Sequence, residues 1–227
     1  MITAIFATRN DEVDLALALS PLVPAAVEGV VKEVIVVDFG SRDGTLTVAE
    51  TAGCDILEAS GNEGLARAAR GAKSDWLLFL SPGAVLDPNW QNEALAFIDQ
   101  AMLSGAAASA AATFRHARPD RGFRARFAEW CAVMRSGGFA APYDEQGLLI
   151  SAALYRSVGG HRAMPAMADV DLARRIGRRR LTLLRTRAVV RHPKRGGEGF
   201  MRGARNAACL AMFVLRLPPS LIARLAA

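Results

Sequence analysis

The stretch "IVVDFGSRDGT", residues 35–45, places an apolar run directly before an acidic residue, a glycine turn and an Asp-Gly pair. Its apolar part belongs to "EVIVVDF", residues 33–39, which lacks polar alternation and is typical of a strand buried on both faces. Asp38 therefore stands at the carboxyl end of a buried strand. A carboxylate in that position needs hydrogen-bond donors, and in a ligand crevice a base or a ribose can provide them.

The polar end of this stretch also has a structural interpretation. "SRDGT", residues 41–45, is a typical helix entry, in which Ser41 or Asp43 can cap the first turn. Capping is the favoured role of these two residues, whereas Asp38 is the candidate for contact with a ligand.

Apolar runs and helical segments alternate through the first eighty residues. The predicted strands are 2–8, 33–39, 55–60 and 75–81, and the predicted helices between them are 12–29, 44–53 and 63–73. Right-handed crossovers of this kind give an α/β fold, with a mostly parallel central sheet flanked by helices. Ligands bind such sheets at the carboxyl ends of the strands, so Asp38 and residues 81–83 are expected at one edge.

Composition is consistent with one substantial core. The chain has 227 residues, of which 52% are hydrophobic, and this predicts one domain with a C-terminal appendage. Three widely spaced cysteines form no metal-binding motif and favour a reducing compartment without disulfides. "MITAIFATRNDE" resembles a strand and a turn rather than a signal peptide, so the expected location is cytoplasmic.

Charge is divided unevenly along the chain. Residues 1–114 contain 6 Lys/Arg and 15 Asp/Glu, a net charge of −9, whereas residues 115–227 contain 22 and 7, a net charge of +15. The basic half is expected to meet an anion, such as a phosphorylated ligand or an anionic membrane surface. Solvated arginines on ordinary surface helices are the structural alternative.

Two segments after residue 100 have open interpretations. Residues 101–114 are small and apolar, which suits a buried strand or a tightly packed segment. Residues 115–140 mix arginine with aromatic residues, which predicts an amphipathic helix, an acceptor-side wall or a membrane contact. Because no recognised RNA-binding motif accompanies them, no nucleic acid polymer is expected as a partner.

A second acidic cluster lies in "MADVDLARRIGRRR", residues 167–180. Asp169 and Asp171 are predicted to begin a helix whose Leu172 and Ile176 face inward and whose arginines face outward. Taken alone, first-turn carboxylates commonly serve only to complement the helix dipole.

In order and spacing, these motifs resemble the family 2 glycosyltransferases, which have the GT-A nucleotide-sugar fold. The resemblance rests on "VVDFGSRDGT", on "LLFL" with its following turn, and on "GGH" followed by "ADVDLARR". It is closest to a bacterial subgroup with a basic, apolar helical region at the C-terminus, here residues 200–227. The resemblance implies a single GT-A-like domain at 1–199, with a nucleotide-sugar-binding half at 1–114 and an acceptor half at 115–199.

The resemblance also implies roles for individual residues. Asp169 matches the general base that takes a proton from the acceptor hydroxyl as it attacks the anomeric carbon with inversion. The donor is a nucleotide sugar of UDP, GDP or dTDP type. The implied nucleotide-binding residues are Thr8, Asn10, Glu12, Asp38 and Ser41; the diphosphate region holds Ser81, Gly83, His192 and Arg195; and the acceptor residues are Asp144 and Gln146.

The chain departs from the family pattern where a metal ion is expected. The last Asp of the family's DXD signature binds a divalent cation, Mg²⁺ or Mn²⁺, but this chain has "LFLSPGA" with Gly83 in that place. Asp87 follows four residues later, too far along the loop to replace it. No metal ligand is therefore assigned. Basic side chains could offset the diphosphate charge instead, and the candidates are Arg67, Arg70, Arg191, Lys194 and Arg195.

Three hypotheses follow for the function. The chain is an active, metal-independent glycosyltransferase; a degenerate member that retains nucleotide binding or a regulatory task; or a protein of the inner membrane surface that acts through residues 200–227. The apolar part of that region is too short to span a bilayer. His116 and His161 have no evident ligand partners and are expected on the surface or in loops. The sequence gives no oligomeric state.

Overall fold

The structure is a computed structural model that describes residues 1–117, 146–164 and 168–190. Its strands form one eight-stranded sheet in the order β3-β2-β1-β4-β7-β6-β8-β5. The strands are β1 (Ile2–Thr8), β2 (Val31–Asp38), β3 (Asp55–Glu58), β4 (Trp76–Leu80), β5 (Ala84–Leu86), β6 (Ala111–Ala117), β7 (Leu148–Ser151) and β8 (Leu181–Val190). Only β7 and β5 run against the other strands, so the prediction of a mostly parallel sheet is confirmed.

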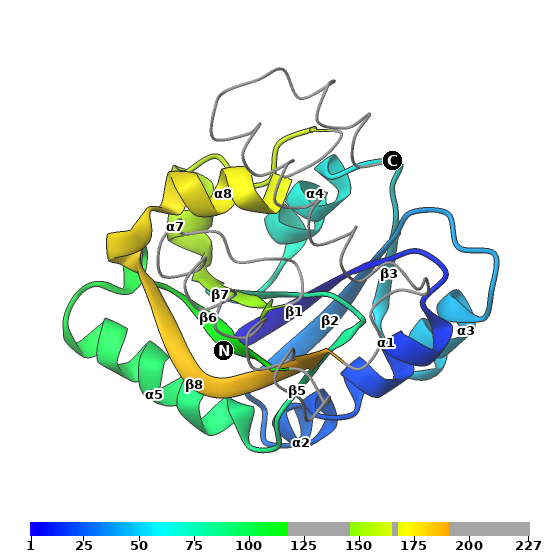
Figure 1. The fold of residues 1–227 in the computed structure, drawn as a ribbon, viewed down its shortest axis with the longest axis horizontal. Helices are drawn as coiled ribbons and strands as arrows, with labels where there is room; N and C mark the ends of the chain where they lie inside the picture. Colours follow the sequence, from blue (N-terminus) through cyan, green and yellow to red (C-terminus); the bar gives the residue numbers. More distant parts are fainter. Residues whose placement is uncertain (118–145, 165–167, 191–227) are drawn as a thin grey trace, which may run out of the picture.

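Helices cover both faces of this sheet (Figure 1). The α-helices are α1 (Glu12–Leu19), α2 (Leu22–Val27), α3 (Thr45–Thr51), α4 (Glu63–Gly71), α5 (Trp90–Leu103), α7 (Ala152–Ser157) and α8 (Ala168–Ile176), with short 3₁₀ turns at Ala107–Ser109 and Arg178–Arg180. Helices α1, α2, α3 and α5 pack on one face, and α4, α7 and α8 on the other. Among the described residues, none of the helices is long and apolar enough to cross a membrane.

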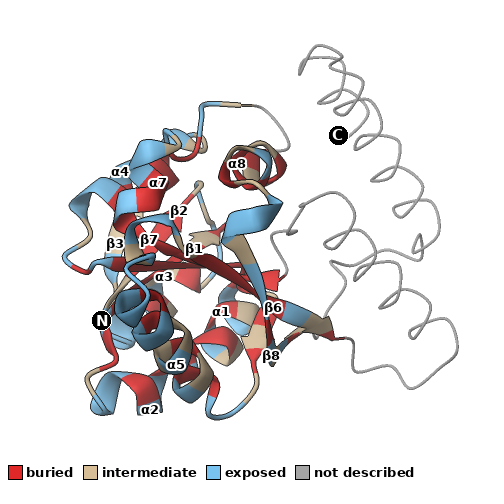
Figure 2. Cartoon of the chain, turned by 90° about the vertical axis from the view of Figure 1, so that its left-hand side faces the viewer, coloured by how far each residue is buried: buried red, intermediate tan, exposed pale blue. Residues whose placement is uncertain are grey.

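The alternation of side chains along the strands builds two apolar cores. In β1, Ala4 and Phe6 face the first group of helices, whereas Ile5 faces the second. In β4, Leu78 and Phe79 divide in the same way. Successive side chains of a strand point to opposite faces, so runs without polar alternation fill both cores. Figure 2 shows these central strands as the buried interior.

The register of the strands aligns the carboxyl ends that matter for a ligand site. Thr8 pairs with Asp38, and Asp38 pairs with Glu58, so β1, β2 and β3 end in one row. Leu80, the last residue of β4, pairs with Phe6 of β1. The loops that follow these four strands therefore lie along one edge of the sheet.

Two elements differ from the sequence-based predictions. The helix expected at 12–29 is two helices, α1 and α2, with Pro21 at the N-cap of the second. Residues 101–114, expected as a strand or packed segment, contain the end of α5, a 3₁₀ turn and the start of β6. The break between α1 and α2 falls at Pro21, because a proline lacks the backbone N–H that a continuous helix needs.

Candidate active site

Asp38 is buried, and its hydrogen bonds come from its own turn and from Thr8 at the end of β1. Its Oδ2 accepts from the backbone N–H groups of Gly40 and Ser41 at 3.0 and 2.9 Å. Its Oδ1 accepts from the hydroxyls of Ser41 and Thr8 at 2.5 and 3.3 Å. Four donors thus occupy a carboxylate that is only 2% exposed. Asp38 shapes the turn that follows β2, and a ligand would have to displace a donor to bind it directly.

The loop after β1 and the loop after β2 are tied to each other. Ser41 Oγ accepts from Asn10 N at 2.9 Å, and Asn10 Oδ1 accepts from Arg42 N at 2.7 Å. Glu12 Oε2 accepts from Gly44 N at 3.1 Å. Three predicted nucleotide-binding residues, Asn10, Glu12 and Ser41, therefore hold one loop against the other. They preorganise this edge of the sheet.

Asp43 completes the connection between the loops. Its Oδ2 accepts from Glu12 N at 3.2 Å, and its Oδ1 accepts from the N–H and the hydroxyl of Thr45. Partial burial raises the pKa of Asp43, but the hydrogen bonds from Thr45 and Glu12 outweigh it and lower the pKa overall. The N-cap of α3 is Gly44, so the predicted capping position is wrong by one residue, although Asp43 does bond the first turn.

A polar pocket opens between the ends of β2 and β3. It has a cavity volume of about 470 Å³. Its lining residues are Asp38, Gly40, Ser41, Leu46, Glu58, Ala59 and Ser60. Two of the predicted nucleotide-binding residues line it. Because the backbone N–H groups of Gly40 and Ser41 already donate to Asp38, the side chains of Glu58 and Ser60 are the polar groups that a ligand would meet.

The turn after β4 offers hydroxyl and backbone groups but no carboxylate. Ser81 is buried, and its carbonyl accepts from Ala84 N at 2.9 Å. A Cβ built on Gly83 would meet no atom within 4 Å. Asp87 lies at the β5–β8 edge, where it bonds the backbone of Arg187. Divalent cations of the Mg²⁺ or Mn²⁺ type prefer carboxylate oxygens, and the described residues of this turn do not fit one.

Asp169 stands at the start of α8, as predicted, but its partner was not foreseen. Its Oδ1 lies 3.0 Å from Nε2 of His161. The other imidazole nitrogen, Nδ1, lies 2.8 Å from the hydroxyl of Tyr155. The His161 side chain is 2% exposed and that of Asp169 43%. His161 does lie in a loop, between α7 and α8, but it is buried, so the expectation of a surface position is wrong.

The two first-turn acids of α8 have different environments. Asp171 is held by Arg175, whose Nε and terminal nitrogen approach its Oδ2 at 2.8 and 2.7 Å. Arg175 also donates to the carbonyls of Val158 and Gly160, so it faces the protein and not solvent, contrary to the sequence-based prediction. Asp171 is thereby a structural residue, and Asp169 is the accessible carboxylate.

A narrow apolar pocket with a cavity volume of about 30 Å³ lies beneath Asp169. Its lining residues are Ile5, Ala7, Leu65, Phe79, Leu80, Gly147, Leu148, His161, Asp169 and Leu172. Apart from the loop residues Gly147 and His161, these residues come from β1, β4, β7, α4 and α8. The pocket brings His161 and Asp169 together with the strand ends at the candidate edge.

Most of the remaining predicted site residues lie outside the described part of the chain. Gln146 is buried, and its Oε1 has no hydrogen-bond partner among the residues that the structure describes. Asp144, His192 and Arg195 lie outside the described residues. His161 and Tyr155 were missed; the available signal was the glycine pair in "YRSVGGH", which allows the chain to turn back so that residue 161 meets residue 155.

Comparisons with known proteins agree with this architecture. Among solved structures, glucosyl-3-phosphoglycerate synthase from Mycobacterium tuberculosis, in complex with Mn²⁺ and UDP-glucose, matches with a TM-score of 0.63 at 18% identity. The match covers 96% of this chain and 80% of that chain. A structure described as a mycobacterial protein matches with a TM-score of 0.65 at 17% identity, covering 96% of this chain and 76% of that one. At these identities the likeness shows the fold.

Sequence comparison gives the family. No curated protein sequence matches significantly. The family model described as "Glycosyl transferase family 2" matches residues 3–151, which is more than half of the chain. This chain belongs to glycosyl transferase family 2.

Proposed function

We propose that this protein is an inverting glycosyltransferase, which moves a sugar from a nucleotide-diphosphate donor to an acceptor hydroxyl. The observation that carries this proposal is the Asp169 carboxylate, which is 43% exposed at an apolar pocket yet held by a buried partner. A general base needs this combination of access and fixed orientation. The pocket lies at the carboxyl ends of the strands, the usual ligand edge of an open α/β sheet.

The chemistry requires one proton acceptor and one leaving group. Asp169 takes the proton from the acceptor hydroxyl as the hydroxyl oxygen forms its bond to the anomeric carbon. The bond from that carbon to the diphosphate oxygen breaks on the opposite side, and the nucleoside diphosphate leaves with the electron pair. A single displacement of this kind inverts the configuration at the anomeric carbon.

A UDP-type donor is proposed, with GDP and dTDP types as alternatives. The solved synthase that matches this fold was crystallised with UDP-glucose. In this chain, the polar pocket beside Asp38 and Ser41 offers a nucleoside the side chains of Glu58 and Ser60. The interlocked loops after β1 and β2 would hold the pocket in place before the donor arrives, which lowers the entropy cost of binding.

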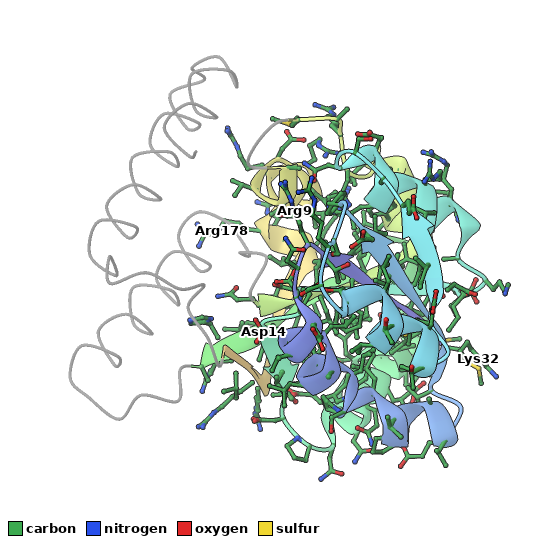
Figure 3. All side chains as sticks on the ribbon, turned by 90° about the vertical axis from the view of Figure 1, so that its right-hand side faces the viewer. Arg9, Asp14, Lys32 and Arg178 are labelled. Atoms are coloured by element: carbon green, nitrogen blue, oxygen red, sulfur yellow. The ribbon has the colours of Figure 1, made fainter. Side chains whose placement is uncertain are left out.

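Basic side chains are proposed to offset the charge of the leaving diphosphate. Arg9 follows β1 and is exposed at the candidate edge, far from Lys32 at the opposite side of the sheet (Figure 3). Arg67 on α4 donates to the carbonyl of Glu58, a lining residue of the polar pocket. Preorganised cations at this edge would stabilise the developing charge.

A second candidate is a degenerate glycosyltransferase that binds a nucleotide without transferring a sugar. It is favoured by the turn at Ser81 and Gly83, which lacks the carboxylate expected in the family. A cytoplasmic location and a peripheral role at the inner membrane surface remain predictions, because residues 200–227 lie outside the described part of the chain.

Calorimetric titration with UDP, GDP and dTDP in EDTA tests the donor site. We expect one of them to bind without a metal ion. Asp38→Asn places an amide against N–H donors and should weaken that binding at least about tenfold. Asp99→Asn, an exposed change on α5 outside the polar pocket, is the matched control. If none of the three nucleotides binds, the donor site and the second candidate are both wrong.

A further inference from the structure

His161 is a buried polar residue in a mainly apolar setting. Its ring packs edge-on against Phe79 with centroids 4.8 Å apart, and Phe79 is stacked on Tyr155 at 5.2 Å. A phenylalanine would suit this packing equally well, and burying a polar ring is unfavourable unless its nitrogens are hydrogen-bonded. Both ring nitrogens of His161 have hydrogen-bond partners, which indicates that the polar ring has a role beyond packing.

The hydrogen bonds determine which nitrogen holds the ring proton. The Tyr155 hydroxyl accepts from the backbone N–H of His161 at 2.9 Å, so its own proton is available for Nδ1. Burial raises the pKa of Tyr155 to about 12, which keeps the phenol protonated near neutral pH. In the neutral imidazole, Nδ1 then accepts and Nε2 carries the proton. Nε2–H therefore points to Oδ1 of Asp169.

The local backbone fixes this geometry. Gly160 has φ +58, and a Cβ there would lie 2.7 Å from the ring of Tyr155, so only glycine allows the turn. Arg175 donates hydrogen bonds to the carbonyls of Val158 and Gly160, which flank Gly159. Asn62 donates to the carbonyl of Met164 at 2.8 Å, which secures the chain after His161.

We propose that His161 is a positioning residue for Asp169: its Nε2–H holds Oδ1, so that Oδ2 is aimed at the acceptor hydroxyl. Within the described ranges, Oδ1 is the Asp169 oxygen with a protein donor, and Oδ2 has none. In the reaction, the acceptor proton moves to Oδ2, and His161 keeps its own proton. This inference rests on the proposed function, in which Asp169 is the general base.

Matched variants separate positioning from simple packing. His161→Phe keeps an aromatic ring against Phe79 and Tyr155 but removes the donor, whereas His161→Gln keeps an N–H donor of similar reach. The measured reaction is UDP release from UDP-glucose, with water in place of the acceptor. We expect His161→Phe to lower kcat about 10- to 100-fold with little change in KM, and His161→Gln to recover most of the loss. Unchanged turnover in folded His161→Phe would overturn the inference.

Nitrogen-15 NMR gives a second readout that does not depend on turnover. The chain has three histidines, so the signals of His161 are identified by their loss in His161→Phe. We expect the wild-type protein to show the Nε2–H tautomer at neutral pH, and Tyr155→Phe to weaken that preference. An Nδ1–H tautomer in the wild type would overturn the inference whatever the turnover. If the Nε2–H tautomer is present but UDP-glucose is not consumed, the proposed function fails with this donor and the hydrogen bond stands.

Discussion

Gly83 occupies the position where the family pattern expects a metal-binding aspartate, and the structure leaves room for a side chain there. Its φ is not in the left-handed region, and a Cβ would meet nothing within 4 Å. Packing therefore does not require glycine at this position. We propose that the missing carboxylate is a chemical change in the site, and a single substitution tests this.

Gly83→Asp is expected to restore a response to metal ions. A carboxylate beside the diphosphate would add a ligand for Mn²⁺, so Mn²⁺ should tighten UDP binding by about tenfold in the variant. Calorimetry with Mn²⁺ and with EDTA measures this difference. Gly83→Asn, which adds similar bulk without the charge, is the control. An equal Mn²⁺ effect on the wild-type protein would contradict the absence of a metal role at this turn.

The two aspartates at the start of α8 show what residue-level pattern reasoning could and could not predict. The sequence correctly predicted both at the first turn of an amphipathic helix. It could not separate their roles, because these depend on contacts made by residues elsewhere in the chain. Arg175 holds Asp171 from within the helix, whereas His161 reaches Asp169 only through the turn at Gly160.

At the scale of elements, β8 is secured to α5 by one carboxylate. Glu93 accepts hydrogen bonds at 2.7 Å from the backbone N–H groups of both Arg185 and Thr186, and it also bonds the Thr186 hydroxyl. Burial raises the pKa of Glu93, but the hydrogen bonds from Thr186 and Arg185 outweigh it, so the pKa lies below its ordinary value of 4.5. The charged form is the one that stabilises the fold.

This arrangement predicts how stability depends on pH. Because the folded-state pKa of Glu93 is lowered, its contribution is present above the ordinary value of 4.5 and is lost as pH falls through the folded-state pKa. Glu93→Gln should lower the free energy of unfolding by about 1–2 kcal/mol near neutral pH, and by less in acid. Urea unfolding near neutral pH and in acid measures this difference in the free energy of unfolding. Glu50→Gln, at an exposed position, is the control. A deficit that is the same in acid would contradict the assigned role.

Strands β1, β2 and β4 could be predicted because each contains an apolar run, and β3, "DILE", because it alternates with the predicted helices. Strands β5, β7 and β8 were not predicted, since β5 and β7 are short and β8 carries several exposed residues. Helix α5 was also missed, although Asn89 at its N-cap is a residue type that marks helix starts. The apolar patterns thus located strands β1 to β4 but not β5, β7 and β8.

At the scale of the whole molecule, one sheet joins strands from the acidic first half of the chain to strands from the basic second half. The proposed site lies where the loops of the first half meet α8 of the second. The topology of the sheet brings together the carboxyl ends of the strands, the bonded loops after β1 and β2, and the accessible Asp169 carboxylate. Local sequence patterns do not encode this topology. The predicted division at residues 114 and 199 remains a prediction.

The most direct measurement compares UDP release from UDP-glucose, in EDTA, by the wild-type protein and by Asp169→Asn. Asparagine preserves shape but is a poor proton acceptor, so we expect turnover to fall by about 100- to 10,000-fold while UDP affinity is unchanged. Asp99→Asn should retain full turnover. Equal turnover by wild-type protein and Asp169→Asn would contradict the role of Asp169 as the general base.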